Sequence, residues 1–119
     1  MINTYLFDFQ TKTIKSQSFD NISLPKAILD NYNFLLYWIC KQIFPEYSII
    51  DHQRFRNKKG LPDFQLLNFD NGKSIYVEMK LIGSCGLNYD QLKFMFENKD
   101  CYVLCYSIDD TPYEKFVRV

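Results

Sequence analysis

The dipeptide Asn71-Gly72 is the feature that most restricts how this 119-residue chain can fold. It lies between two runs, residues 63–70 and 73–81, in which apolar and polar side chains largely alternate. A period of two is typical of strands. Asn-Gly favours the tight type I′ turn, because both central residues of that turn need a positive φ. We therefore expect a β-hairpin with a two-residue loop at this position.

The register of that hairpin groups three polar side chains on one face. With a two-residue loop, Asp63 lies opposite Lys80 and Gln65 lies opposite Glu78. Opposed residues share a face and successive side chains alternate, so Asp63, Glu78 and Lys80 project together. The opposite face receives apolar residues, namely Phe64, Leu66, Ile75, Val77, Met79 and Leu81. A slip of one residue would mix the two faces, so the apolar pattern supports the register.

The rest of the chain predicts a mixed α/β fold, with helices on the faces of the sheet. Strands are expected at residues 2–8, 13–19, 47–52 and 101–107. Helices are expected at residues 24–43, with Ser23 as the cap and Pro45 after the end, and from Asn88 or Asp90 to about Lys99. The tail, 111–119, is expected to hold a short helical turn and a last strand. We expect a single domain over 1–119, with 1–20 as an N-terminal β-hairpin extension and 24–107 as the core.

Charge and cysteine content exclude some classes of protein. Fourteen Lys and Arg balance fourteen Asp and Glu, which excludes binding to nucleic acid through overall basicity alone. The four cysteines form no C-x-x-C pair and the chain has one histidine, His52, which argues against a structural zinc site. We interpret the cysteines as core residues of an intracellular, cytoplasmic protein, with a disulfide as the open alternative. The longest apolar stretch, 34–40, is too short to span a membrane.

The acidic pair and the lysine suggest hydrolytic chemistry on phosphodiesters. Two carboxylates within a few ångströms repel each other unless a cation lies between them. Mg²⁺ takes such oxygen ligands together with waters and phosphate oxygens, and it lowers the pKa of an attacking water. Lys80 would stabilise developing negative charge or orient that water. The alternative is ordinary: Glu78 and Lys80 fit a solvated strand face, and Asp63 after Pro62 fits a strand entry.

A basic segment precedes the first strand of the hairpin. It comprises Arg54, Arg56, Lys58, Lys59 and the glycine that follows, Gly60. Such side chains bind phosphates and release counterions, and a glycine permits close backbone approach to a ligand. We predict that this segment binds nucleic acid, with a solvated loop as the alternative.

Two short segments resemble the motif of the PD-(D/E)xK nuclease superfamily. Gly60-Leu61-Pro62-Asp63 and Tyr76-Val77-Glu78-Met79-Lys80 are similar to the form seen in VRR-NUC and archaeal Holliday-junction-resolvase-like members. The segment around Gln91 resembles the glutamine-bearing helix that follows in that superfamily. The resemblance implies a restriction-endonuclease-like core and a Mg²⁺- or Mn²⁺-dependent endodeoxyribonuclease, acting on DNA that includes branched or structured forms.

The resemblance also implies roles for individual residues. Asp63 and Glu78 would hold the metal together with the Met79 carbonyl. Lys80 would act on the attacking water, and Gln91 would shape the site or contact the DNA backbone.

One departure from the superfamily concerns the first helix. Many relatives carry a glutamate there that supports the metal, whereas this chain offers only Asp30, with Glu46 just past the helix end. The alternative function is therefore a catalytically inactive DNA- or protein-binding module on the same fold, or a plain structural protein. A homodimer is also expected, because so small a domain covers few base pairs and two active sites would cut both strands.

Overall fold

The computed structural model describes residues 1–20, 31–51, 60–83 and 86–108. Its strands and helices follow one another along the chain as β1 (Ile2–Asp8), β2 (Thr13–Phe19), α2 (Tyr32–Ile43), β3 (Ser48–Asp51), β4 (Phe64–Leu67), β5 (Ser74–Leu81), α3 (Tyr89–Glu97) and β6 (Cys101–Ile108). This order confirms the predicted mixed α/β fold. No helix in these ranges is long and apolar enough to cross a membrane.

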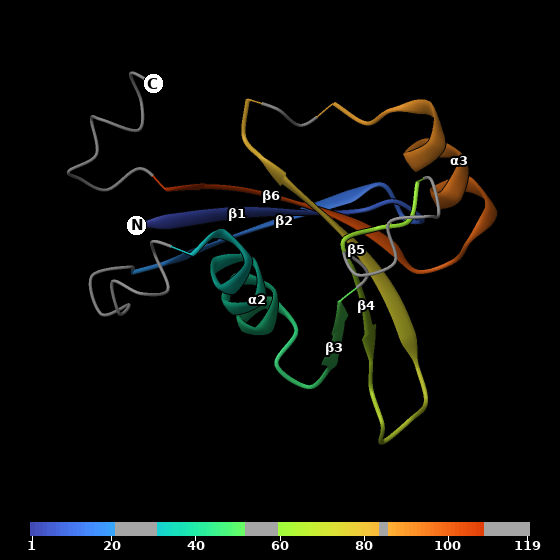
Figure 1. Ribbon diagram of the computed structural model, residues 1–119, viewed down its shortest axis with the longest axis horizontal. Helices are drawn as coiled ribbons and strands as arrows, with labels where there is room; N and C mark the ends of the chain where they lie inside the picture. Colours follow the sequence, from blue (N-terminus) through green and yellow to red (C-terminus); the bar gives the residue numbers. More distant parts are fainter. Residues whose placement is uncertain (21–30, 52–59, 84–85, 109–119) are drawn as a thin grey trace.

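The six strands form one twisted sheet in the order β2-β1-β6-β5-β4-β3. β5 and β6 are parallel, and every other neighbouring pair is antiparallel. A parallel pair needs a crossover connection, and α3 supplies it between β5 and β6. Figure 1 shows α2 and α3 on opposite faces of the sheet, with the β4–β5 hairpin and the neighbouring β3 directed away from β1 and β2.

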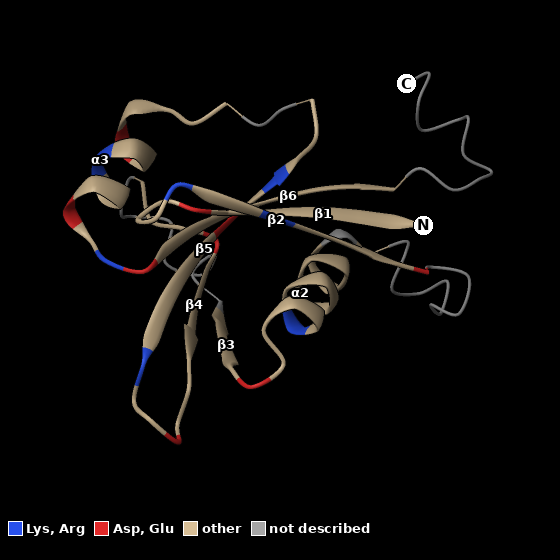
Figure 2. Ribbon diagram, turned by 180° about the vertical axis from the view of Figure 1, so that it is seen from behind, with Lys and Arg blue, Asp and Glu red and all other residues tan. Residues whose placement is uncertain are grey.

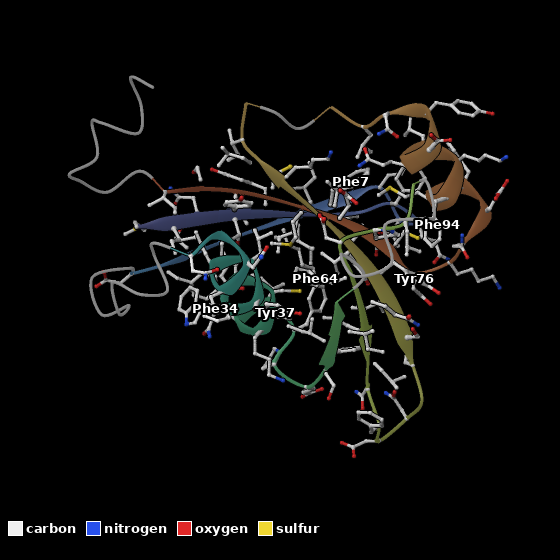
Figure 3. All side chains as sticks on the ribbon, in the orientation of Figure 1. Phe7, Phe34, Tyr37, Phe64, Tyr76 and Phe94 are labelled. Atoms are coloured by element: carbon white, nitrogen blue, oxygen red, sulfur yellow. The ribbon has the colours of Figure 1, made fainter. Side chains whose placement is uncertain are left out.

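The face of the sheet toward α2 carries the larger apolar core. Its buried residues come from α2 and from alternating positions on β1, β4, β5 and β6: Ile2, Leu35, Leu36, Ile39, Cys40, Phe64, Leu66, Ile75, Val77, Met79, Leu104 and Tyr106. Figure 3 shows Tyr37 and Phe64 meeting between the helix and the sheet, with ring centroids 5.0 Å apart. The predicted apolar face of the hairpin is therefore buried against α2, except that Leu81 at its end is exposed.

The face toward α3 carries a smaller cluster. Met95, Cys101 and Val103 are buried there, and the half-buried rings of Phe7, Tyr76 and Phe94 pack against them. The rings of Tyr76 and Phe94 meet edge to face at 5.0 Å (Figure 3). A helix rises about 1.5 Å per residue and a strand about 3.3 Å. The nine-residue α3 is therefore only about half as long as the eight-residue strands β5 and β6, and it covers only part of the face beneath it.

The N-terminal strands have the predicted bounds and extend the main sheet. β1 pairs with β2 along its whole length on one side and with β6 on the other. At the connecting turn the Asp8 carboxylate accepts the Gln10 N–H at 3.0 Å, and Lys12 adopts a positive φ of 58°. β2 is thereby one of the two edge strands of the sheet, and β3 is the other.

The helix predicted from residue 24 is described from Tyr32 onward. Its described N-cap is Asn31, whose side chain accepts the Phe34 N–H at 3.2 Å. The predicted cap Ser23 and the acid Asp30 lie outside the described residues, as does the predicted structure of 111–119. The second helix is capped by Asn88, one of the two predicted caps.

The predicted turn at Asn71-Gly72 is wrong in type. Asn68 and Lys73 close the hairpin, with the Asn68 N–H donating to the Lys73 carbonyl at 2.8 Å, so the loop holds the four residues 69–72. Within that loop, Gly72 alone has a positive φ, of 71°. The buried Asn68 explains the wider loop, since its side-chain oxygen accepts the Asp70 N–H at 2.9 Å and its carbonyl accepts the Gly72 N–H at 2.8 Å.

Candidate active site

The observed register brings the two acids of the hairpin together. β4 and β5 pair Phe64 with Val77 and Gln65 with Tyr76, a shift of two residues from the predicted partners. A shift of two keeps every side chain on its predicted face, because side chains alternate with a period of two. It nevertheless replaces the expected Asp63–Lys80 and Gln65–Glu78 pairs, so that Asp63 lies level with Glu78.

Asp63 is held at the start of β4 by the backbone of β5. Its Oδ2 accepts the Met79 N–H at 2.8 Å. This bond joins the residue before β4 to β5. It extends the contact between the two chain segments beyond their last backbone pair, Phe64 with Val77. The carboxylate of Asp63 is thus positioned beside β5 rather than left in solvent.

Glu78 is a buried acid whose charge is poorly compensated. It is 5% exposed. Burial raises the pKa of its carboxyl from 4.5 to about 8, the negative charge of Asp63 and a hydrogen bond to it add to the rise, and the ammonium of Lys80 opposes it. Two carboxyl groups that share a buried site retain a proton or attract a cation.

Gln91 connects α3 to both charged residues of β5. Its Nε2 donates to Glu78 Oε1 at 3.2 Å, and its Oε1 accepts from Lys80 Nζ at 3.3 Å. Lys80 Nζ also lies 3.9 Å from Glu78 Oε1. The side chains of Glu78, Lys80 and Gln91 therefore form one cluster of mutual contacts.

The orientation of the Gln91 amide is set by the N-terminus of α3. Gln91 Oε1 accepts the Asn88 N–H at 3.0 Å, while Asn88 Oδ1 accepts the Gln91 N–H at 2.9 Å. This reciprocal capping box satisfies two backbone N–H groups of the first helical turn. It also directs Oε1 toward the lysine and Nε2 toward the glutamate.

Gly60 lies where the segment entering β4 crosses the start of α3. It has a positive φ of 78°, and a Cβ atom built on it would come within 2.2 Å of the Asp90 carbonyl oxygen. The close backbone approach predicted for Gly60 is thus observed, but the partner is the protein's own helix. A glycine is required here both by the φ angle and by the contact.

Cys40 is a neighbour of the site that sequence reasoning missed. It lies in the core between α2 and the sheet, and its thiol pKa is raised to about 12, first by burial and then by the charge of Asp63. Because the sequence pattern marked Cys40 only as an apolar helix position, it gave no signal that this side chain lies near the acids. At neutral pH the thiol is protonated and chemically quiet.

The remaining predicted site residues are only partly visible. Arg54, Arg56, Lys58 and Lys59 lie outside the described residues, and Glu46 is exposed beyond the end of α2. Among the residues that are described, no group of three or more His, Cys, Asp and Glu side chains could hold a metal. Figure 2 shows the described Lys positions spread over several elements instead of gathered on one.

No protein-family model, no curated protein and no solved structure matches this chain. What the molecule does is therefore inferred from the contacts of its own side chains. These contacts provide two adjacent carboxyl groups, one of them buried, with an ammonium group and an amide fixed beside them.

Proposed function

We propose that this chain is a metal-dependent endodeoxyribonuclease of the PD-(D/E)xK superfamily, with a restriction-endonuclease-like core. The observation that carries the proposal is the buried carboxyl of Glu78 beside Asp63, with Lys80 and Gln91 in contact with it. Such a constellation costs folding free energy unless a positive charge compensates it. A functional requirement for the two acids accounts for that cost.

The donor set suits Mg²⁺ or Mn²⁺. Both are hard cations that take carboxylate and carbonyl oxygens together with water and phosphate oxygens. Asp63 and Glu78 would supply the carboxylates. The Met79 carbonyl faces the same neighbouring strand as the Met79 N–H that binds Asp63, so it is the third donor we propose. A bound cation would polarise the scissile phosphate and lower the pKa of the attacking water.

Lys80 and Gln91 would contribute to the same reaction, and they contact Glu78 separately from Asp63. The Lys80 ammonium is mostly buried, with 18% of its side chain exposed, so its charge is weakly screened by solvent. It stabilises the negative charge that develops on the phosphate oxygens during hydrolysis. Gln91 holds this ammonium in place through Oε1 and is a positioning residue in this scheme.

DNA is the substrate that we propose, including branched or structured DNA. The segment with Arg54, Arg56, Lys58 and Lys59 directly precedes Gly60 in the chain and remains our prediction for the phosphate-binding region. Neutralising these four charges should weaken DNA binding and reduce its dependence on salt.

A cleavage assay with matched acid variants tests the proposal. Plasmid, hairpin and four-way-junction DNA are incubated with the protein and Mg²⁺ or Mn²⁺. We expect Asp63→Asn and Glu78→Gln to lower the cleavage rate by at least about a hundredfold, the scale of losing a group aimed at the reacting phosphate. Asp70→Asn, at the exposed tip of the same hairpin, is the matched control and should cleave like wild type. If the wild type cleaves no faster than Asp63→Asn, the proposed nuclease activity is refuted.

A second function is favoured by one observation. Glu78 already has Lys80 and Gln91 as partners without a metal ion. No third acid joins Asp63 and Glu78 in the described part of the chain. This arrangement also suits a catalytically inactive DNA- or protein-binding module on the same fold. Salt-sensitive DNA binding that survives in Glu78→Gln, with no cleavage by wild type under any metal, would favour that module.

We also propose that the active form is a homodimer. β2 is an edge strand, and such a strand offers backbone groups to a second copy. Light scattering that finds monomer alone, with and without DNA, would contradict the dimer.

A further inference from the structure

A row of four residues crosses the α3-side face of the sheet, one from each of four neighbouring strands. The backbone pairing sets Lys80 of β5 beside Cys105 of β6, Cys105 beside Tyr5 of β1, and Tyr5 beside Ser16 of β2. Paired residues share a face of the sheet. Tyr5 is also two residues from Phe7, which packs in the α3-side cluster, so both rings lie on this face.

The row runs out from beneath α3: Lys80 contacts Gln91 of α3 and Cys105 packs against the α3-side cluster, whereas Tyr5 lies farther from the helix. In the neighbouring row, Val103 is 5% exposed and Phe7 packs against the cluster beneath α3. Tyr5, by contrast, is 43% exposed although β1 is an inner strand of the sheet. A large ring on an inner strand is thus left open to solvent next to the candidate active site.

The surroundings of Tyr5 are small and polar, unlike those of a protein-docking patch. Ser16 and Cys105 flank it along the row, and the row on its other side contains Asn3 and Ser18, whose side chains are joined by a hydrogen bond of 2.7 Å. Small neighbours leave the ring accessible, and hydroxyl and amide groups suit polar ligands. An aromatic ring among such groups, in line with a lysine, is the arrangement on which nucleobases stack.

We infer that Tyr5 is a stacking position for an unpaired nucleobase next to the phosphate bound at Lys80. Two strand spacings separate the backbones of the two residues, about 9.5 Å. That distance equals about three stacked nucleotides at about 3.4 Å each, and fewer in an unstacked chain. Bases inside a duplex stack on each other and expose no ring face, so the favoured ligand is a single-stranded segment. The inference rests on the proposed function for the position of the phosphate and specifies the substrate class.

Binding without cleavage tests the stack separately from the enzyme. Short single strands of DNA or RNA containing 2-aminopurine, and a blunt DNA duplex, are titrated in EDTA, with fluorescence quenching and anisotropy as readouts. We expect quenching by wild type and a loss of single-strand affinity in Tyr5→Leu between about 5-fold and about 150-fold, the range for one base–aromatic stack. Tyr5→Phe keeps a ring and should bind within about twofold of wild type, given that the ring supplies the stack.

Phe69→Ala is the matched control, since Phe69 is 76% exposed at the tip of the β4–β5 hairpin, away from this row. Its affinity should equal that of wild type. A loss of affinity in Tyr5→Leu for either the DNA or the RNA probe supports the stack. The probe with the larger loss of affinity identifies DNA or RNA as the ligand. Unquenched 2-aminopurine in wild type, equal affinities of wild type and Tyr5→Leu, or tighter binding of the duplex would overturn the inference. None of these readings depends on whether the protein cleaves.

Discussion

The two faces of the β4–β5 hairpin pack against different surroundings. Toward α2, Leu66, Val77 and their neighbours are buried in a closed apolar core. Toward α3, Glu78 and Lys80 each bond to the Gln91 amide, and the face opens to solvent two strands farther along, at Tyr5. One pair of strands thus carries the side chains of the apolar core on one face and those of the candidate site on the other.

The difference has an energetic cause. Apolar side chains on the α2 face gain free energy from burial in proportion to their area. Glu78 loses free energy on burial, because desolvation and a nearby negative charge both disfavour its ionised form. Substitutions on one face should therefore change stability, and substitutions on the other should change activity.

The largest expected effect is on the α2 face. Leu66→Ala should lower the free energy of unfolding by about 2–5 kcal/mol, because Leu66 is fully buried and its loss leaves a cavity. Gln65→Ala, one residue away on the other face, removes a hydrogen bond to Ser74 and should cost only about 1 kcal/mol. Urea denaturation measures both, and equal losses would contradict the separation of the faces.

Lys80→Met tests the α3 face. The cleavage rate should fall by about 10²–10³-fold, the usual loss when one stabilising donor is removed from a charged transition state. The fold should remain intact, since the apolar stem of methionine fits the space of the lysine stem. Lys73→Met provides the control: Lys73 is exposed and makes a 4.0 Å contact to Asp100, so cleavage should not change. A loss below about tenfold for Lys80→Met would remove Lys80 from the mechanism.

The raised pKa of Glu78 predicts how metal-free stability depends on pH. The folded protein holds a proton on Glu78 more tightly than the unfolded chain, so the stabilisation is fully present below pH 4.5. It is lost as the pH rises through about 8. The melting temperature should therefore fall over this window in EDTA, and Glu78→Gln should remove that part of the decrease. Identical pH profiles of wild type and Glu78→Gln would refute the assignment.

Magnesium should act in the opposite sense. Binding to the ionised pair competes with the proton, so Mg²⁺ should bind more tightly as the pH rises toward 8 and above. At a free concentration one hundred times its dissociation constant, Mg²⁺ should add about 2.7 kcal/mol to the stability of wild type. Asp63→Asn should lose this gain. Thermal denaturation with and without Mg²⁺ measures both, and equal gains in the two proteins would place the cation elsewhere.

The smallest expected effect compares two helix caps. Asn88→Ala and Asn31→Ala each remove an N-cap, which typically costs about 1 kcal/mol of stability. Asn88→Ala alone should also slow cleavage, because Asn88 forms the capping box with Gln91. Asn88→Ser, which keeps a capping oxygen, should restore most of the rate. Equal cleavage by the two alanine variants would make Asn88 a structural residue only.

The face on which each hairpin side chain lies could be predicted from sequence, but the pairing of residues between β4 and β5 could not. Alternation assigns each side chain to a face, and that assignment survives any even shift in register. The shift itself came from Asn68, whose buried side chain and carbonyl organise a wider loop than Asn71-Gly72 alone would form. Local turn chemistry thus decided whether Asp63 lies beside Lys80 or beside Glu78.

The contact of Gln91 with β5 was expected only through the resemblance to a nuclease motif. The N-cap at Asn88 could be read from residue type, because Asn accepts from free N–H groups of the first turn. Where α3 lies over the sheet depends on the packing of Tyr76, Phe94 and Met95, which join residues distant in sequence. The open face around Tyr5 could not be predicted either, because it follows from how little of the sheet α3 covers.

The width of the candidate active site depends on a side chain that is absent. Gly60 and the Asp90 carbonyl fit together so closely that the segment carrying Asp63 and the helix carrying Gln91 touch at this point. Because Gly60 has no side chain, the segment before β4 and the start of α3 approach each other as closely as two backbones can. Any larger residue at position 60 would push them apart and draw the amide of Gln91 away from Glu78 and Lys80. The spacing between Gln91 and the acids is thus set by a backbone contact outside the candidate site.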